Sequence, residues 1–351
     1  MGTYFLQRSL KSSKLMNLLY GDNLVDPYQY QYSGSKYTGL RQTHEIFPQI
    51  QEPIFEGSNF TIMIPNYGLI SQLILKITLN SLVSNLNTSP YLGLRLFKNI
   101  YLRRSSDREI IQQINGHYIF ARVLDIINNE KIITSFDPVF DKSCTIYIPL
   151  YFFFSEGPDM YLDPSSDYIT EQGSYEVNLE TDTSLALNGT ISSYELSCFM
   201  TYYYQDIKRL PSYKLVYDNI ISNGFSIATG SSTFYQFLRC RETVFNIHFF
   251  IYNKTTGSYL DLQNYTITVN DVVITSVDIA ADYDLSSKIA RRNNDYIKTY
   301  NTGLEIDRKS FNGPLDLNEL WTFVLNITLS GPISSGYEFF VIYEYYKLLI
   351  N

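Results

Sequence analysis

The sequence contains very few of the residues that bind metals or form disulfides: three cysteines and three histidines among 351 residues. Because the cysteines are odd in number and widely spaced, we expect reduced, buried thiols rather than a disulfide framework. No histidine has a second His or Cys at the spacing of metal ligands. The sequence therefore predicts no metal site and no cofactor. The cysteines are Cys144, Cys198 and Cys240.

Signatures of membrane insertion, export and common enzymes are missing as well. No run approaches the ~18 apolar residues that a membrane-spanning helix needs, and the N-terminus lacks the uninterrupted apolar segment of a signal peptide. There is no glycine-rich phosphate loop and no Gly-X-Ser-X-Gly elbow. We expect a protein that is made and assembled inside a cell and that has no catalytic residues.

Charge is sparse and unevenly distributed. Charged residues make up 18% of the chain and the net charge is −8, which disfavours a nucleic-acid-binding surface. Residues 1–42 nevertheless carry five basic and two acidic side chains, a net charge of +3, with Arg8, Lys11 and Lys14 near the start. We interpret residues 1–50 as an extended N-terminal arm. Two interpretations of it stay open: a solvated tail, or a segment that faces a membrane or a genome.

Aromatic residues are in excess, with 32 Tyr and 22 Phe. They favour strands over helices, and Tyr suits large, partly polar contact surfaces. A genome rich in A and T gives the same bias, so composition alone does not decide between the two explanations.

Alternation of apolar and polar residues predicts strands in most of the first half. We expect seven, close to the eight of a jelly roll, and a helix after Asn115 that continues to Ile127. The predicted strands are Phe60–Ile64, Leu69–Asn80, Leu94–Arg103, Asp107–Gln113, Cys144–Ser155, Tyr175–Leu179 and Tyr194–Tyr204.

The strand Cys144–Ser155 differs from the others. It alternates as far as Leu150, and from there to Phe154 it is unbroken apolar and aromatic sequence, which indicates a strand covered on both faces. Pro149 cannot donate to a strand ladder, so it must lie at a bulge, at a sheet edge or at a bend between sheets. None of these side chains is catalytic, which favours an architectural role.

The second half repeats the plan beyond a domain boundary at 207/208. Asn270-Asp271 indicates a tight hairpin, and Ala280–Tyr300 is interpreted as a loop with a helix. The predicted strands are Tyr213–Tyr217, Phe225–Ala228, Thr233–Arg239, Val244–Tyr252, Tyr265–Val269, Val272–Val277, Trp321–Leu329 and Phe339–Ile350.

The chain resembles the double jelly-roll major capsid proteins of icosahedral DNA viruses, the lineage of nucleocytoplasmic large viruses, virophages and some tailless phages. Over roughly residues 55–350, segments similar to that family's motifs occur in the family's order. The central one is similar to an IPLPFFFS strand, with Tyr151 in place of the second proline. Its matching residues are Ile148, Pro149, Leu150, Phe152, Phe153 and Phe154.

The resemblance implies an all-β fold of two tandem eight-stranded antiparallel jelly rolls packed side by side, with short helices in inter-strand loops. The domains are then an arm (1–50), a first jelly roll (51–207) and a second (208–351). The implied function is structural, in the virion: homotrimeric capsomers of pseudo-hexagonal outline that tile an icosahedral shell. Implied partners are further copies of the chain, minor or cement capsid proteins, and an internal membrane or genome through the arm, without a specific nucleic-acid site.

Two other functions stay open. A glycan-active amidase or a carbohydrate-binding protein can also be built from two jelly rolls, although such enzymes are usually exported and carry disulfides. A minor capsid or scaffold protein of the same fold is the other alternative.

Overall fold

The structure is a computed structural model. It describes residues 40–50, 52, 55, 57–66, 68–80, 92–126, 144–155, 161–164, 175–182, 193–204, 213–222, 224–278, 297–301, 315–317 and 322–350. The chain divides into two compact units. The N-terminal unit consists mainly of Tyr28–Val123 and Asn129–Val216, and the C-terminal unit mainly of Tyr217–Lys347. The predicted boundary at 207/208 lies outside the described residues.

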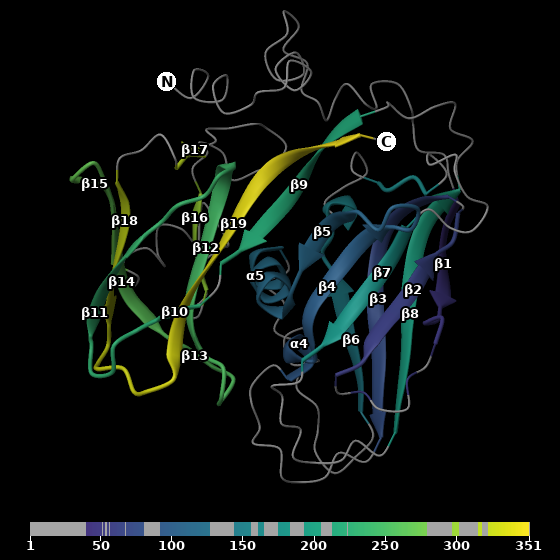
Figure 1. Ribbon diagram of the computed structural model, residues 1–351, viewed down its shortest axis with the longest axis horizontal. Coiled ribbons are helices and arrows are strands. Elements are labelled where there is room, and N and C mark those ends of the chain that lie inside the picture. Colours follow the sequence, from purple (N-terminus) through teal and green to yellow (C-terminus); the bar gives the residue numbers. More distant parts are fainter. Residues whose placement is uncertain are drawn as a thin grey trace, which may run out of the picture. The chain divides into compact units, whose positions relative to one another are not determined.

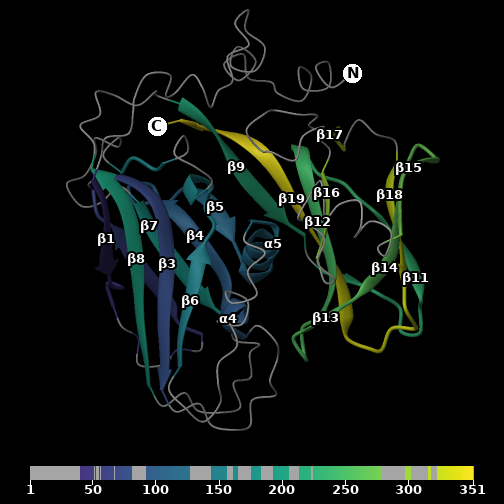
Figure 2. The same ribbon diagram turned by 180° about the vertical axis from the view of Figure 1, so that it is seen from behind.

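Two four-stranded antiparallel sheets form the N-terminal unit, in the orders β1-β8-β3-β6 and β2-β7-β4-β5 (Figure 1). Figure 2 shows β1, β8, β3 and β6 side by side. Each sheet combines strands from both ends of the unit, which is the jelly-roll arrangement. The strands are Leu40–Ile46 (β1), Asn59–Ile64 (β2), Leu69–Asn80 (β3), Phe97–Arg104 (β4), Ile110–Ile114 (β5), Cys144–Leu150 (β6), Tyr175–Thr181 (β7) and Ser193–Tyr204 (β8).

The first strand corrects the sequence analysis, which placed residues 1–50 in an arm. Leu40–Ile46 pairs antiparallel with β8 along its whole length and forms an edge of the sheet. The alternation is weak because two of the inward residues, Gln42 and His44, are polar. There the Tyr202 hydroxyl donates to Gln42 Oε1 at 2.6 Å and lies 3.2 Å from His44 Nε2.

The predicted strand Cys144–Ser155 is shorter than expected. It ends at Leu150, and the aromatic residues that follow form a 3₁₀ turn, Phe153–Ser155 (η1). A continuous apolar run does not distinguish a strand from a buried turn. Pro149 belongs to the edge strand β6, where it pairs with Ile74 of β3. A sheet edge is one of the positions expected for this proline.

Helices in the described part of the N-terminal unit are short. The predicted helix is confirmed as α5 (Gly116–Ile126), and Asn115 caps it, because its Oδ1 accepts a hydrogen bond of 2.9 Å from the Tyr118 N–H. Leu92–Arg95 forms a helical turn, α4, so the expectation that Leu94 begins a strand is wrong. No helix among the described residues is long and apolar enough to span a bilayer.

The C-terminal unit repeats the arrangement. One sheet has the order β10-β19-β12-β13, with β16 and β17 also paired to β12 and β9 to β19; the other is β11-β18-β14-β15. The strands are Tyr213–Ile221 (β9), Phe225–Ser226 (β10), Thr233–Phe237 (β11), Thr243–Asn253 (β12), Ser258–Leu260 (β13), Leu262–Val269 (β14), Val272–Asp278 (β15), Lys298–Asn301 (β16), Leu315–Asp316 (β17), Phe323–Leu329 (β18) and Tyr337–Ile350 (β19).

In this unit the structure confirms one sequence expectation and corrects another. The tight hairpin is confirmed, since Asn270 and Asp271 both have positive φ (49° and 64°) between β14 and β15. Strand β16 begins inside Ala280–Tyr300, which was expected to be a loop with a helix; the residues before Ile297 lie outside the described part. Its pairing with β12 explains the strand.

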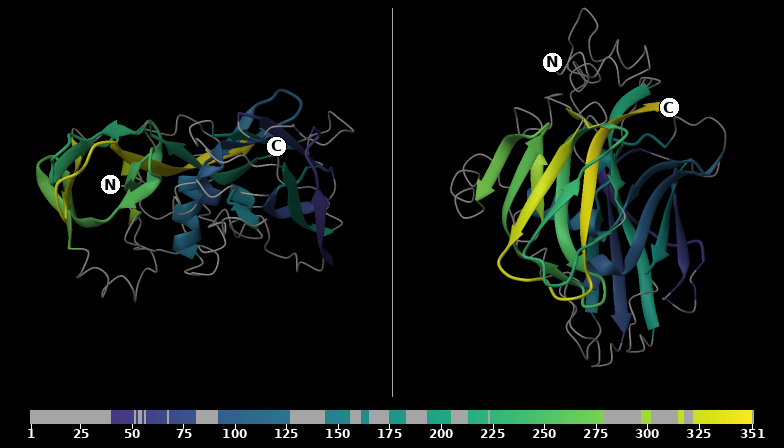
Figure 3. Two further views of the ribbon diagram at one scale, coloured as in Figure 1. Left: turned by 90° about the horizontal axis from the view of Figure 1, so that it is seen from below. Right: turned by 60° about the vertical axis from the view of Figure 1, so that its left-hand side comes forward.

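Apolar side chains fill the space between the two sheets of each unit. In the N-terminal unit Phe60 of β2 meets Tyr194 of β8 with ring centroids 5.7 Å apart. In the C-terminal unit Phe249 of β12 meets Tyr265 of β14 edge to face at 4.9 Å, and Figure 3 shows the two sheets around this core. The described part of the chain is thus two β-sandwiches of the same strand order.

Substitution of three glycines by alanine distinguishes the loss of stability caused by backbone strain from the loss caused by steric crowding. Gly68 has a φ of +69°, and a Cβ there would clash with the Tyr202 ring, so Gly68→Ala should lower the free energy of unfolding by roughly 2–4 kcal/mol. Gly230→Ala meets only the strain of a φ of +87° and should cost about 1–2 kcal/mol. Gly331→Ala is the control, with neither effect.

Chemical denaturation followed by circular dichroism measures the three variants. Because Gly68 lies in one unit and the other two glycines in the other, the transitions of both units are followed. A Gly68→Ala variant as stable as Gly331→Ala would contradict the close approach of Tyr202.

Candidate functional site

The residues singled out from the sequence lie together at the end of β6. Ile148 and Leu150 point into the N-terminal sandwich, and Phe152, Phe153 and Phe154 are all at most 1% exposed. Phe154 contacts both other rings, with centroids 5.7 Å from Phe152 and 5.4 Å from Phe153.

Hydrogen bonds hold this aromatic turn in place. The Phe153 N–H donates to Gln112 Oε1 of β5 at 2.8 Å, and the Ser155 hydroxyl donates to the Leu150 carbonyl at 3.1 Å. Gln112 is 1% exposed, so its amide replaces the water that the turn's backbone would otherwise need. The turn therefore ties β6 to the opposite sheet, and it supplies no group for catalysis.

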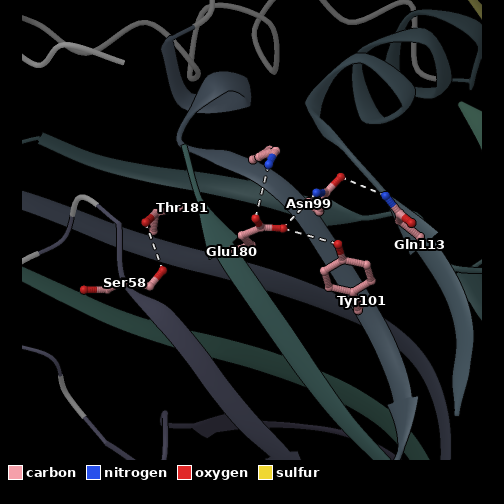
Figure 4. Close-up of polar contacts among 7 residues, drawn as sticks. Ser58, Asn99, Tyr101, Gln113, Glu180 and Thr181 are labelled. Carbon is pink, nitrogen blue, oxygen red and sulfur yellow. Dashed lines mark hydrogen bonds and ion pairs between the residues drawn. The ribbon is translucent and has the colours of Figure 1, made fainter. Parts of the chain in front are cut away.

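A network of polar side chains covers the outer face of the sheet β2-β7-β4-β5 (Figure 4). Glu180 Oε2 accepts hydrogen bonds from Asn99 Nδ2 at 2.8 Å and from the Tyr101 hydroxyl at 3.2 Å. Lys98 Nζ lies 3.4 Å from Glu180 Oε1, and Gln113 Nε2 donates to Asn99 Oδ1 at 2.8 Å. The network thus spans three neighbouring strands, β7, β4 and β5, and the direct partners of the carboxylate all come from β4.

These contacts set the charge of Glu180. The hydrogen bond from Asn99 is the main cause that lowers its pKa below the ordinary value, partial burial opposes this, and Lys98 adds to the lowering. A carboxylate held ionised in this way is a poor general acid. The described residues contain no group of three His, Cys, Asp or Glu that would hold a metal ion.

A second polar cluster is buried in the C-terminal unit. His248 Nε2 lies 3.4 Å from Glu344 Oε2, and His248 Nδ1 lies 2.8 Å from Thr299 Oγ1. Asn246 Nδ2 donates to the same Glu344 oxygen at 2.6 Å. His248, Asn246 and Glu344 are at most 1% exposed, so no substrate reaches them. The cluster joins β12, β16 and β19.

The remaining predicted residues divide between the described and the undescribed parts of the chain. Cys198 and Cys240 are buried, and burial raises the pKa of the Cys198 thiol to about 12, so that thiol is unreactive. Cys144 begins β6. Arg8, Lys11 and Lys14 lie outside the described residues.

Sequence reasoning did not find the Glu180 network. Alternation places Asn99 and Tyr101 on one face of a strand, which was available from the sequence. Their shared partner became visible only with the register, in which Asn99 lies opposite Glu180 and Tyr101 opposite Asn178.

Removal of the acceptor under the aromatic turn should destabilise the N-terminal unit. Gln112→Met keeps the shape but leaves the buried Phe153 N–H without an acceptor, so we expect a loss of about 1–3 kcal/mol in the free energy of unfolding. Gln113→Met is the matched control on the same strand, where water replaces the lost partner and the loss should stay below about 1 kcal/mol. Urea denaturation measures both, and equal losses would contradict the anchoring role.

Asn99→Ala should raise the pKa of Glu180 toward its ordinary value, because the largest cause of its lowering is removed. NMR titration of the carboxyl carbon measures the shift, and Thr61→Ala, on the same face but bonded to Asn178, is the control. A lowered folded-state pKa stabilises the fold above the unfolded value of 4.5, and this is lost as pH falls through the folded value. Asn99→Ala should therefore flatten the decline in stability below about pH 5.

No protein-family model matches the sequence, and no curated protein matches it either. Solved structures do match. The capsid structure of the virus PBCV-1 aligns with a TM-score of 0.71 and 12% identity, over 91% of this chain and 97% of that one. The Faustovirus major capsid protein aligns with a TM-score of 0.64 and 10% identity, over 100% and 98%.

A structure from the Sulfolobus Turreted Icosahedral Virus aligns with a TM-score of 0.52 and 12% identity, over 89% of this chain and 91% of that one. These identities are too low to carry residue roles between proteins, and the matches concern the fold. That fold extends over nearly the whole length of each match. The chain therefore has the double jelly-roll fold that these viral capsid proteins share.

Proposed function

We propose that this chain is the major capsid protein of an icosahedral DNA virus, a structural protein of the virion that is assembled inside the host cell. The observation that carries the proposal is the repetition of one strand order in both halves of a single chain. The sheets β1-β8-β3-β6 and β2-β7-β4-β5 correspond to β10-β19-β12 with β16 and to β11-β18-β14-β15. The likeness to solved capsid proteins over nearly the full chain supports it.

Two similar sandwiches in one polypeptide suit a shell built on six-fold packing. Three copies of the chain present six similar blocks, so a homotrimer has a pseudo-hexagonal outline and fits a lattice position with six neighbours. Closed symmetric assemblies also cover the sheet edges that an isolated sandwich leaves open. Contacts between neighbouring capsomers extend the same self-association to the shell.

The arm is proposed to lie beneath the capsomer. Arg8, Lys11 and Lys14 give this end of an acidic chain a local positive charge, which suits an internal membrane of anionic lipid or the genome. Minor or cement capsid proteins are the other proposed partners.

The polar network around Glu180 is the feature that favours the carbohydrate alternative, because carboxylate, amide and hydroxyl groups on a sheet face suit sugar hydroxyls. These groups already bond to one another, and a glycan would have to displace those bonds. A minor capsid or scaffold protein of the same fold is distinguished by its place and copy number in the particle.

The mass of the purified protein tests the proposal. Three copies of a 40.7 kDa chain should give a particle of about 122 kDa in analytical ultracentrifugation, and negative-stain electron microscopy should show flat particles of hexagonal outline. A monomer that hydrolyses a glycopeptide would instead favour the amidase, and a monomer at all concentrations would end the capsomer proposal.

A further inference from the structure

Exposed apolar side chains lie on both edge strands of one sheet of the C-terminal unit. Among the described residues, four of the ten large hydrophobic side chains that are exposed belong to β11 and β15. Tyr235 is 66% exposed, Phe237 48%, Val272 64% and Val273 58%. Isolated exposed hydrophobics are ordinary, whereas neighbouring aromatic side chains exposed on one surface, as Tyr235 and Phe237 are, indicate an interaction site.

The surface in question is the outer face of three strands of this sheet, β11, β18 and β14. Along β11 and β18 the core side chains alternate with outward ones, as the burial of Phe323, Leu325 and Ile327 shows. None of the described outward side chains on β11, β18 and β14 is charged. We name this surface the uncharged face: Thr233, Tyr235, Phe237, Val324, Asn326, Thr328, Asn264, Thr266 and Thr268.

The two aromatic residues of this face are neighbours whose side chains are in contact. Tyr235 and Phe237 are successive outward residues of β11, and their rings meet edge to face with centroids 5.9 Å apart. Strand β11 is the edge of its sheet, and cross-strand pairing places Tyr235 opposite Asn326 and Phe237 opposite Val324. Large rings at the centre of a contact supply much of its binding energy.

The corresponding sheet of the N-terminal unit has the opposite character. Its strand order, β2-β7-β4-β5, matches β11-β18-β14-β15 position by position. Its outer face carries the Glu180 and Lys98 ion pair and Arg103 stacked on the Tyr101 ring at 4.8 Å. The fold therefore does not require an uncharged surface at this position, and the difference belongs to the sequence of the second unit.

We infer that the uncharged face is a contact surface for a second copy of this chain. Copies with a net charge of −8 repel one another, so they associate most readily through a surface without charge. Nucleic acid and anionic lipid are excluded as occupants by the same observation, because both bind through Lys and Arg side chains, which the described part of this face lacks. The inference rests on the proposed function and locates a subunit contact within it.

Rotational symmetry determines how this contact is used. In a trimer each copy presents the uncharged face once, to a different surface of the next copy. One substitution therefore changes all three contacts of the ring. The effect on assembly is thus larger than the effect on the stability of a single chain.

The test adds two charges to matched positions of the two units. Tyr235→Glu with Phe237→Glu alters the uncharged face, and Thr61→Glu with Met63→Glu alters the outward positions of β2, the equivalent strand of the N-terminal unit. Sedimentation equilibrium measures association, and circular dichroism and the unfolding midpoint report the fold. We expect the first pair to raise the dissociation constant of the oligomer by roughly 30-fold or more, and the second by less than about threefold.

A second pair of substitutions, Tyr235→Thr with Phe237→Thr, is used if the glutamates prevent folding, because threonine keeps a high strand propensity. We expect this pair to raise the dissociation constant of the oligomer by roughly tenfold. A folded variant that associates like the wild type overturns the inference and leaves the capsomer proposal intact. A wild-type protein that stays monomeric overturns both. Binding of the trimer to zwitterionic lipid vesicles that depends on Tyr235 and Phe237 assigns the face to lipid, and also overturns the inference.

Discussion

Each unit depends on the pairing of an early strand with its last strand. In the N-terminal unit β3 pairs with β8 from Leu69 opposite Tyr203 to Asn80 opposite Ser193. In the C-terminal unit β12 pairs with β19 in the same way. Both pairs join segments far apart in sequence, so the backbone groups of the central strands are satisfied only when the unit is complete. Such pairing makes folding slow and unfolding cooperative within a unit.

The buried polar groups follow from the same pairing. Register places Asn246 opposite Glu344, and His248 two residues along the same face. A carboxylate in a buried position is costly unless it is hydrogen-bonded. Asn246 Nδ2 supplies a hydrogen bond to Glu344 within the sheet, and His248 Nε2 lies 3.4 Å from the same oxygen. The aromatic turn in the other unit obeys the same rule, since the Gln112 amide accepts from a buried backbone N–H.

Much of the fold was predictable because period-two alternation is strong where one face of a strand is buried. Leu69–Asn80 was predicted to its bounds, since its apolar side chains recur at every second position. Strand β1 is not predictable in this way, because an edge strand tolerates polar side chains such as Gln42 on its inner face. Strand β16 is not predictable either, because Lys298 is fully buried, whereas lysine is usually exposed. The Glu180 network depends on register, which alternation does not determine.

Joining two jelly rolls in one chain removes the constraint that identical subunits impose. Six identical blocks around an axis must present the same surfaces to one another, whereas two linked blocks are free to differ. The described outer faces use that freedom: the sheet around Glu180 is charged and internally bonded, whereas the uncharged face around Tyr235 carries two exposed aromatic rings. Because both sheets share one topology, the difference arises from outward residues that the core does not constrain. In the trimer that we propose, only one of the two faces favours burial, which gives the three chains a defined rotational order.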